Sequence, residues 1–224
     1  MKVALQLLAS TVGGILFMGA LLFWPAGTFD YWQAWVFIAA FIVGSMVPTI
    51  YLAAKYPDAL QRRFKSGPWA ETRMAQRLIN VGIITTVIAA GVISALDYRF
   101  GWSHPPIAVI VLGNVLVLTG LVIAELVIIQ NNFAAATITV EENQPVVSTG
   151  LYGVVRHPMY VGALIVMVGM PLALASYWGL LTAIPAVLVF VARITDEEKA
   201  LRQELDGYDE YTQKVHYRLV PGVW

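Results

Sequence analysis

The sequence predicts an all-α protein: a polytopic membrane helical bundle of about five to six spans, followed by a C-terminal amphipathic helix. Hydrophobic residues make up 58% of the 224-residue chain and charged residues only 12%, whereas a soluble domain carries roughly 25% charged residues. The mean hydropathy is +0.70. The apolar residues also occur in runs long enough to cross a bilayer, which takes roughly 20 residues as a helix.

Four apolar runs predict single spans, and a fifth predicts a hairpin. The single spans are residues 3–24, 31–54, 78–96 and 107–129. The fifth run, 159–194, is too long for one helix and short for two, and Tyr177-Trp178-Gly179 near its middle predicts a tight turn. A five-span arrangement would need one segment to lie on the membrane surface, so we favour six spans with the last two as a hairpin.

The distribution of basic residues predicts the orientation of the bundle. Residues 55–77 contain six Lys or Arg. With six spans, this loop shares a side with Lys2, the 130–157 connection and the C-terminal tail, and only Arg99 lies on the other side. The positive-inside rule therefore predicts that both termini and the long polar connections are cytoplasmic.

Composition argues against several other classes of protein. The chain has no cysteine and a net charge of zero, which excludes disulfides and thiolate metal sites and disfavours nucleic acid as a partner. His104 and His216 have no neighbours at metal-ligand spacing, so we expect no metal, and no Gly-rich phosphate loop follows a predicted strand.

The stretch Arg156-His157-Pro158 stands directly before the predicted hairpin. Pro158 suits the first turn of a helix, and the residue before a proline favours an extended conformation. Arg156 and His157 should therefore lie at the start of the helix, with exposed backbone groups that attract anions. The alternative is an Arg that reaches lipid headgroups and a His that caps the helix.

Two adjacent carboxylates, Glu197 and Glu198, follow the last predicted span. Thr195 and Glu198 have the spacing of a capping box, which would start a new helix here. Neighbouring residues on a helix point about 100° apart, so one glutamate could cap the helix while the other faces a pocket. In the tail, Tyr208, Tyr211 and Val215 form one face at helical spacing, which predicts an amphipathic helix.

Together these segments resemble the membrane methyltransferases of the isoprenylcysteine carboxyl methyltransferase and phospholipid methyltransferase group, and the chain looks most like the bacterial, isoprenylcysteine methyltransferase-like branch. The matching stretches are Gly150-Leu151-Tyr152, Arg156-His157-Pro158-Met159-Tyr160-Val161-Gly162, Arg193 with Glu197-Glu198, and the tail residues Tyr208 and Tyr211. The resemblance covers residues 150–224, and the first half of the chain matches only as generic spans.

The resemblance implies S-adenosylmethionine (SAM) as methyl donor, bound on the cytoplasmic side of a bacterial inner membrane. Residues 130–224 would form the SAM-binding core, and residues 1–129 the N-terminal transmembrane helices. The cofactor-binding positions carried over by motif are Tyr152, Arg156, His157, Pro158, Tyr160, Gly162, Glu197 and Glu198. The chemistry agrees, because carboxylates can bind the hydroxyls or ammonium of SAM, while His157 and backbone amides can bind its carboxylate.

The acceptor implied by the resemblance is a lipophilic small molecule or lipid that arrives from the bilayer, with membrane lipids as the other partners. A carboxylate acceptor needs a cation to position it. Arg193 or Arg156 could do this, and we favour Arg193 because it ends the last apolar run beside the acidic pair. An amine acceptor needs a base, for which Glu125 or a member of the acidic pair is the candidate. Both O-methylation and N-methylation therefore stay open.

Two other functions are compatible with parts of the sequence. A sterol-reductase-like enzyme using NADPH shares an Arg-His-Pro-x-Tyr segment, but it usually has Asn where this chain has Met159. A transporter or assembly protein without enzymatic activity is the second alternative. Transporters usually show interrupted spans in two corresponding halves, and Pro48, Pro171 and Pro185 interrupt spans here without that symmetry.

Overall fold

The structure, a computed structural model, describes the chain except residues 1, 58–59, 61–70, 72 and 134–143. Every regular element in the described residues is a helix, as predicted. The elements are α1 (Lys2–Ala26), α2 (Trp32–Lys55), α4 (Met74–Phe100), α5 (Ile107–Gln130), η2 (Gly150–Gly153), α6 (Pro158–Ala173), η3 (Trp178–Thr182), α7 (Ala183–Glu204) and α8 (Tyr208–Lys214).

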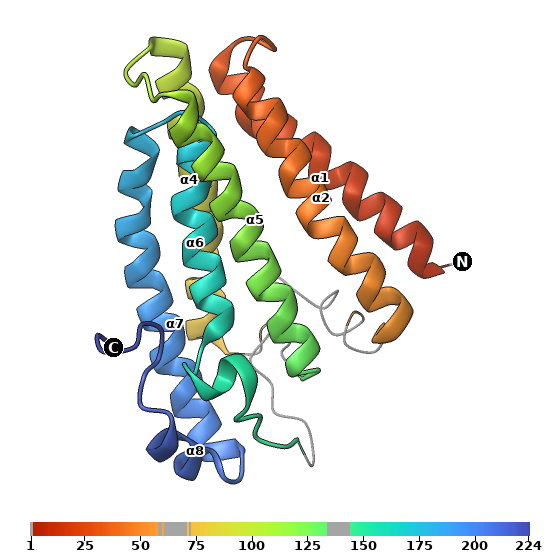
Figure 1. Ribbon diagram of the computed structural model, residues 1–224, viewed down its shortest axis with the longest axis vertical. Coiled ribbons are helices and arrows are strands. Elements are labelled where there is room, and N and C mark those ends of the chain that lie inside the picture. Colours follow the sequence, from red (N-terminus) through yellow and green to blue (C-terminus); the bar gives the residue numbers. More distant parts are fainter. Residues whose placement is uncertain (1, 58–59, 61–70, 72, 134–143) are drawn as a thin grey trace.

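The long helices run alternately up and down, so the loops gather at two ends of the bundle (Figure 1). Among the described residues, five helices are long and apolar enough to cross a membrane, and α6 is a shorter apolar helix. Its 16 residues rise roughly 24 Å, against about 30 Å for the hydrocarbon core of a bilayer. Helices α6 and α7 form the predicted hairpin, joined by residues 174–182.

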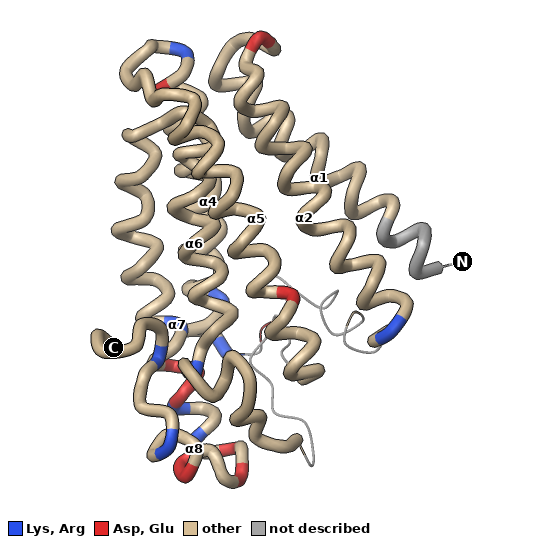
Figure 2. Tube along the Cα trace, in the orientation of Figure 1, with Lys and Arg blue, Asp and Glu red and all other residues tan. Residues whose placement is uncertain are grey.

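The Lys and Arg residues are unevenly distributed between the two ends of the bundle. Arg99 lies in the last turn of α4, before the α4–α5 loop. Figure 2 shows most of the described Lys and Arg towards the opposite end, which carries α8. At the end of the bundle that carries Arg99, a group of buried polar residues links the hairpin to α4. Asp97 is fully buried and accepts hydrogen bonds from Ser176 (2.5 Å) and Ser103 (2.7 Å). The Tyr31 hydroxyl donates to the Leu174 carbonyl oxygen at 2.6 Å.

Helices α5 and α6 pack closely because glycines face each other at their crossing. A Cβ placed on Gly162 would lie 2.7 Å from the Gly120 carbonyl oxygen, closer than real Cβ contacts allow. Small residues at helix crossings let backbones approach within a membrane, where packing rather than the hydrophobic effect drives association. This crossing fixes the start of α6, and therefore the Arg-His-Pro segment, against the end of α5.

The last membrane helix extends further than the sequence predicts. Helix α7 continues through the acidic pair to Glu204, and the Thr195 hydroxyl donates to the Val191 carbonyl oxygen one turn earlier at 2.8 Å. The capping-box interpretation of Thr195 and Glu198 was therefore wrong, because no helix begins there. The tail helix α8 starts after Gly207, whose φ of 83° lies in the left-handed region that glycine adopts without strain.

Candidate functional site

The Arg-His-Pro turn is covered by the C-terminal segment. His157 is the N-cap residue of α6, and Pro158 occupies the first turn. Arg156 and His157 are buried. Their backbone amides donate to the carbonyl oxygens of Tyr217 (2.9 Å) and Arg218 (3.0 Å). The expectation of exposed amides at this helix start was wrong, because the tail folds back and uses both donors.

Glu198 is the buried anchor of this turn. One of its oxygens accepts from Arg156 Nε at 2.7 Å and lies 3.2 Å from His157 Nε2. The other accepts from Arg218 Nε at 3.0 Å and lies 2.9 Å from Arg218 Nη2. The Arg156 guanidinium also donates to the Val215 and His216 carbonyl oxygens at 2.8 and 2.9 Å. Glu198 therefore joins α7, the start of α6 and the tail.

Glu197 points to a different side of α7. Its carboxylate accepts a hydrogen bond from the Tyr160 hydroxyl at 2.5 Å and lies 3.9 Å from His157 Nδ1. Its side chain is 22% exposed, against 4% for that of Glu198. The rotation of about 100° between neighbours on a helix thus separates the two carboxylates, and only Glu197 lines the adjacent cavity.

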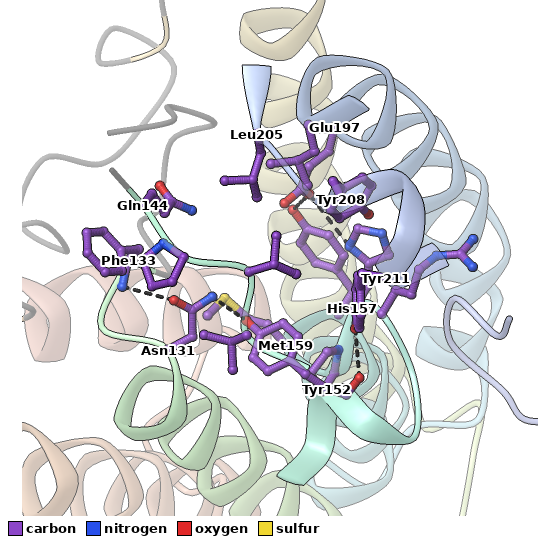
Figure 3. Close-up of a pocket in the computed structure, with 17 residues that line it drawn as sticks. Asn131, Phe133, Gln144, Tyr152, His157, Met159, Glu197, Leu205, Tyr208 and Tyr211 are labelled. Carbon is purple, nitrogen blue, oxygen red and sulfur yellow. Dashed lines mark hydrogen bonds and ion pairs between the residues drawn. The ribbon is translucent and has the colours of Figure 1, made fainter. Parts of the chain in front are cut away.

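A cavity lies between the start of α6, the end of α7, the tail helix α8 and the segment after α5 (Figure 3). Its empty volume is about 820 Å³, a figure that includes space open to solvent. The polar and aromatic residues that line it are Asn131, Phe133, Gln144, Tyr152, Arg156, His157, Tyr160, Glu197, Tyr208 and Tyr211. The sequence-predicted Pro158 also lines it, next to the apolar Met159.

The floor of the cavity is held by tyrosines. Tyr211 donates from its hydroxyl to the Tyr152 carbonyl oxygen at 2.7 Å, and Asn131 Nδ2 donates to the Tyr152 hydroxyl at 3.3 Å. Burial raises the pKa of Tyr152 to about 12, and the nearby charge of Glu197 acts in the same direction. Burial likewise raises the pKa of Tyr208 and of Tyr211. These phenols are therefore neutral at physiological pH.

The tail helix closes one wall of the site, as its predicted apolar face requires. Tyr208, Tyr211 and Val215 are buried together. Leu201 and Leu205 at the end of α7 and Val146 before η2 pack against them. The segment before η2, the end of α7 and the tail therefore share one small core beside the cavity.

Arg193 lies behind the wall of the cavity. Its Nε donates to the Tyr160 hydroxyl at 3.1 Å, and its Nη1 donates to Glu71 (3.0 Å) and Gln76 (2.5 Å). Arg193, Glu71 and Gln76 are buried. Glu71 and Gln76 were not predicted as site residues. Their signal in the sequence is a pair of amide side chains, Gln76 and Asn80, one turn apart at the start of an apolar helix.

Two other sequence-predicted residues lie away from the cavity lining. Gly162 packs against the Gly120 carbonyl oxygen at the α5–α6 crossing. Glu125 lies on α5, more than one turn before that helix ends, and is half-buried. The remaining predicted cofactor residues converge around the cavity or, in the case of Glu198, directly behind it.

Comparison with known proteins adds one finding. Residues 108–206 match the family model described as Phospholipid methyltransferase, and no curated protein matches the chain. The matched segment begins in α5 and includes the Arg-His-Pro turn, the hairpin and both glutamates. The match implies a membrane methyltransferase. Over residues 108–206 the chain is thus similar to the phospholipid methyltransferase family, the group that its motifs resemble.

Proposed function

We propose that the protein transfers a methyl group from SAM to a lipophilic acceptor, with SAM bound in the cavity between α6, α7 and α8. The observation that carries this proposal is the position of Glu197. This carboxylate lies inside the segment matched by the family and faces a cavity that is also lined by tyrosines. SAM, when bound, supplies an electrophilic methyl group.

The donor set of the cavity fits the chemistry of SAM. Glu197 offers an anion for the ammonium or the ribose hydroxyls of SAM, because a charge-assisted hydrogen bond to either is strong. The amides of Asn131 and Gln144 lie across the cavity from Glu197 (Figure 3) and can donate to a carboxylate. The rings of Phe133 and Tyr208 provide apolar faces for adenine.

The residues of the Arg-His-Pro turn position the site. In our proposal His157 and Tyr160, whose rings stack and which approach the same oxygen of Glu197, orient its carboxylate. Arg156 holds the turn to Glu198 and the tail. Pro158 starts α6 at the cavity wall, and Gly162 lets α6 approach α5 closely enough to keep that wall in place. Tyr152 contributes a neutral hydroxyl at the floor.

The acceptor in this proposal is a lipid or an apolar small molecule from the bilayer. Met159 lines the cavity and also packs against an apolar cluster of Leu52, Leu60 and Ile128. Leu60 in turn lines an apolar groove between α1 and α2. Apolar residues in contact therefore connect the groove between α1 and α2 with the cavity, and these apolar surroundings suit an acceptor with a hydrocarbon chain.

The reaction requires little acid–base chemistry from the protein. A carboxylate acceptor is already ionised and needs only to be held in line with the methyl group. An amine acceptor needs a base, and Glu197 at the cavity is better placed than Glu125. Arg156 is the cation nearest the cavity for a carboxylate acceptor, whereas Arg193 acts through Tyr160. Carboxyl O-methylation is consequently the simpler chemistry for this site.

The positive-inside rule supports a cytoplasmic site, because the end of the bundle that carries the cavity also carries most of the Lys and Arg (Figure 2). A soluble donor such as SAM is available there. The proposed membrane is the inner membrane of a bacterium, in keeping with the branch that the motifs resemble.

Calorimetry with detergent-purified protein tests the proposal. Wild type should bind SAM saturably, and Glu197→Gln should weaken binding about tenfold or more, because it removes a charged hydrogen-bond partner. Asp209→Asn, which removes an exposed carboxylate of α8, is the matched control and should bind like wild type. NADPH is the comparison ligand. Binding of NADPH but not SAM by folded wild type would refute the proposal in favour of a reductase.

A further inference from the structure

A buried polar cluster joins the beginning of α4 to α7, next to the cavity but outside its lining. At its centre, Arg193 Nη1 has three acceptors: Glu71 at 3.0 Å, Gln76 at 2.5 Å and Asn80 at 3.5 Å. Glu71 is itself held by α4, because its backbone carbonyl oxygen accepts from Arg77 Nε at 2.7 Å and its side chain accepts from Asn80 at 3.3 Å.

The hydrogen bonds from this cluster to the cavity have a fixed direction. Arginine has no acceptor, so the contact between Arg193 Nε and the Tyr160 oxygen must use the arginine proton. The single proton of the phenol is then directed to Glu197, at 2.5 Å. Each bond in such a chain polarises the next in a low-dielectric interior.

The charge of Glu71 matters as much as its hydrogen bond. Arg193 is a buried cation, and the Tyr160 hydroxyl forms hydrogen bonds with both Arg193 and Glu197. Opposite charges attract strongly where water is excluded, so an Arg193 without its own anion would draw Glu197 towards itself and away from the cavity. Glu71 is 1% exposed and supplies that anion. Asp196, the third carboxylate of the region, is engaged by Arg73 at 3.2 Å and by Gln76.

We propose that Glu71 and Gln76 are positioning residues for donor binding: they hold and neutralise Arg193, so that Tyr160 directs its proton to Glu197 and the Glu197 carboxylate stays aimed into the cavity. The inference rests on the proposed function, because the ligand that Glu197 serves is SAM. It adds two residues that lie before α5, outside the segment matched by the family.

A double-mutant cycle tests action through Tyr160. SAM affinity is measured by calorimetry for wild type, Glu71→Gln, Tyr160→Phe and the double variant. Glu71→Gln should weaken SAM binding about tenfold, the effect of a hydrogen bond to a charged group. In the Tyr160→Phe background, the same change should alter the affinity less than about twofold, because the route to Glu197 is already broken. Gln76→Met should follow the same pattern.

The control is Asp97→Asn, which removes the charge of another fully buried carboxylate at the far end of the bundle. It should leave SAM affinity unchanged even where it lowers thermal stability. Equal losses from Glu71→Gln in both backgrounds, or no loss while wild type binds, would overturn the inference and leave the proposed function standing. Failure of both Glu71→Gln and Gln76→Met to fold would assign these residues to the fold alone. Absence of SAM binding by wild type would overturn both proposals.

Discussion

Substitution of Glu197 and substitution of Glu198 should have different effects on stability and on donor binding. Glu198 is buried and is held by Arg156, His157 and Arg218 at distances of 2.7 to 3.2 Å. Glu197 lines the cavity and is partly exposed. We therefore expect Glu198→Gln to reduce the stability of the protein, and Glu197→Gln to reduce donor binding with little loss of stability.

The magnitudes follow from burial and from the groups left behind. Glu198→Gln keeps the shape but removes the charge, so the buried Arg156 guanidinium loses its anion. Breaking a buried ion pair in this way costs about 3–5 kcal/mol, a large part of a typical stability of about 5–15 kcal/mol. Glu197→Gln keeps an acceptor for the Tyr160 hydroxyl, and its cost should be about 1 kcal/mol or less.

The assay is denaturation of both variants and wild type in the same detergent, with SAM affinity measured on each preparation. Glu198→Gln should unfold far more readily than wild type. Glu197→Gln should unfold like wild type and lose about tenfold or more in SAM affinity. Equal stability of the two variants, or a selective binding defect in Glu198→Gln, would show that the division between anchor and ligand-facing carboxylate is wrong.

Three further predictions concern the packing, the far end of the bundle and the cavity floor. Gly162→Val should destabilise the α5–α6 pair, whereas Gly13→Val, at a position with open space around it, should be tolerated in the same denaturation assay. Asp97→Asn should lower stability by about 1–3 kcal/mol, because Ser176 and Ser103 lose a charged acceptor, and should not change SAM affinity in calorimetry. The pKa of Tyr152 is raised to about 12 from 10.0, so the stability that its neutral phenol contributes is full below pH 10 and is lost as the pH rises towards 12. A spectrophotometric titration of wild type minus Tyr152→Phe should show this phenol ionising near pH 12, and ionisation near pH 10 would contradict its burial.

The membrane helices could be predicted from sequence because a bilayer imposes a length rule on apolar runs. That rule located the spans and the hairpin, and Pro158 marked the start of α6. The same rule placed the end of α7 too early, since the apolar run stops near Ile194 while the helix continues to Glu204. Beyond the apolar run, Tyr208 and Tyr211 pack against Leu201 and Leu205, and this tertiary contact supports the polar extension of α7.

The motif residues could be located from the sequence, but the role of each one could not be predicted. The spacing of Glu197 and Glu198 predicts different directions on a helix and does not say which one faces a cavity. That choice depends on the tail, whose Arg218 engages Glu198 across 20 positions of sequence. The pairing of Arg193 with Glu71 could not be predicted for a similar reason, because the two residues lie 122 positions apart. In the loop that contains Glu71, the prediction of orientation used the basic residues only.

The site and the tail depend on each other for a physical reason. The backbone amides of Arg156 and His157 donate to the tail, and the Arg156 guanidinium donates to two further tail carbonyl oxygens. Detaching the tail would therefore leave buried donors without acceptors and would remove Arg218 from Glu198, and each such loss is costly in a water-poor interior. The Arg-His-Pro turn consequently has its observed shape only while the tail is docked. The same turn presents His157 and Tyr160 to Glu197, so the docked tail stabilises the cavity through this turn.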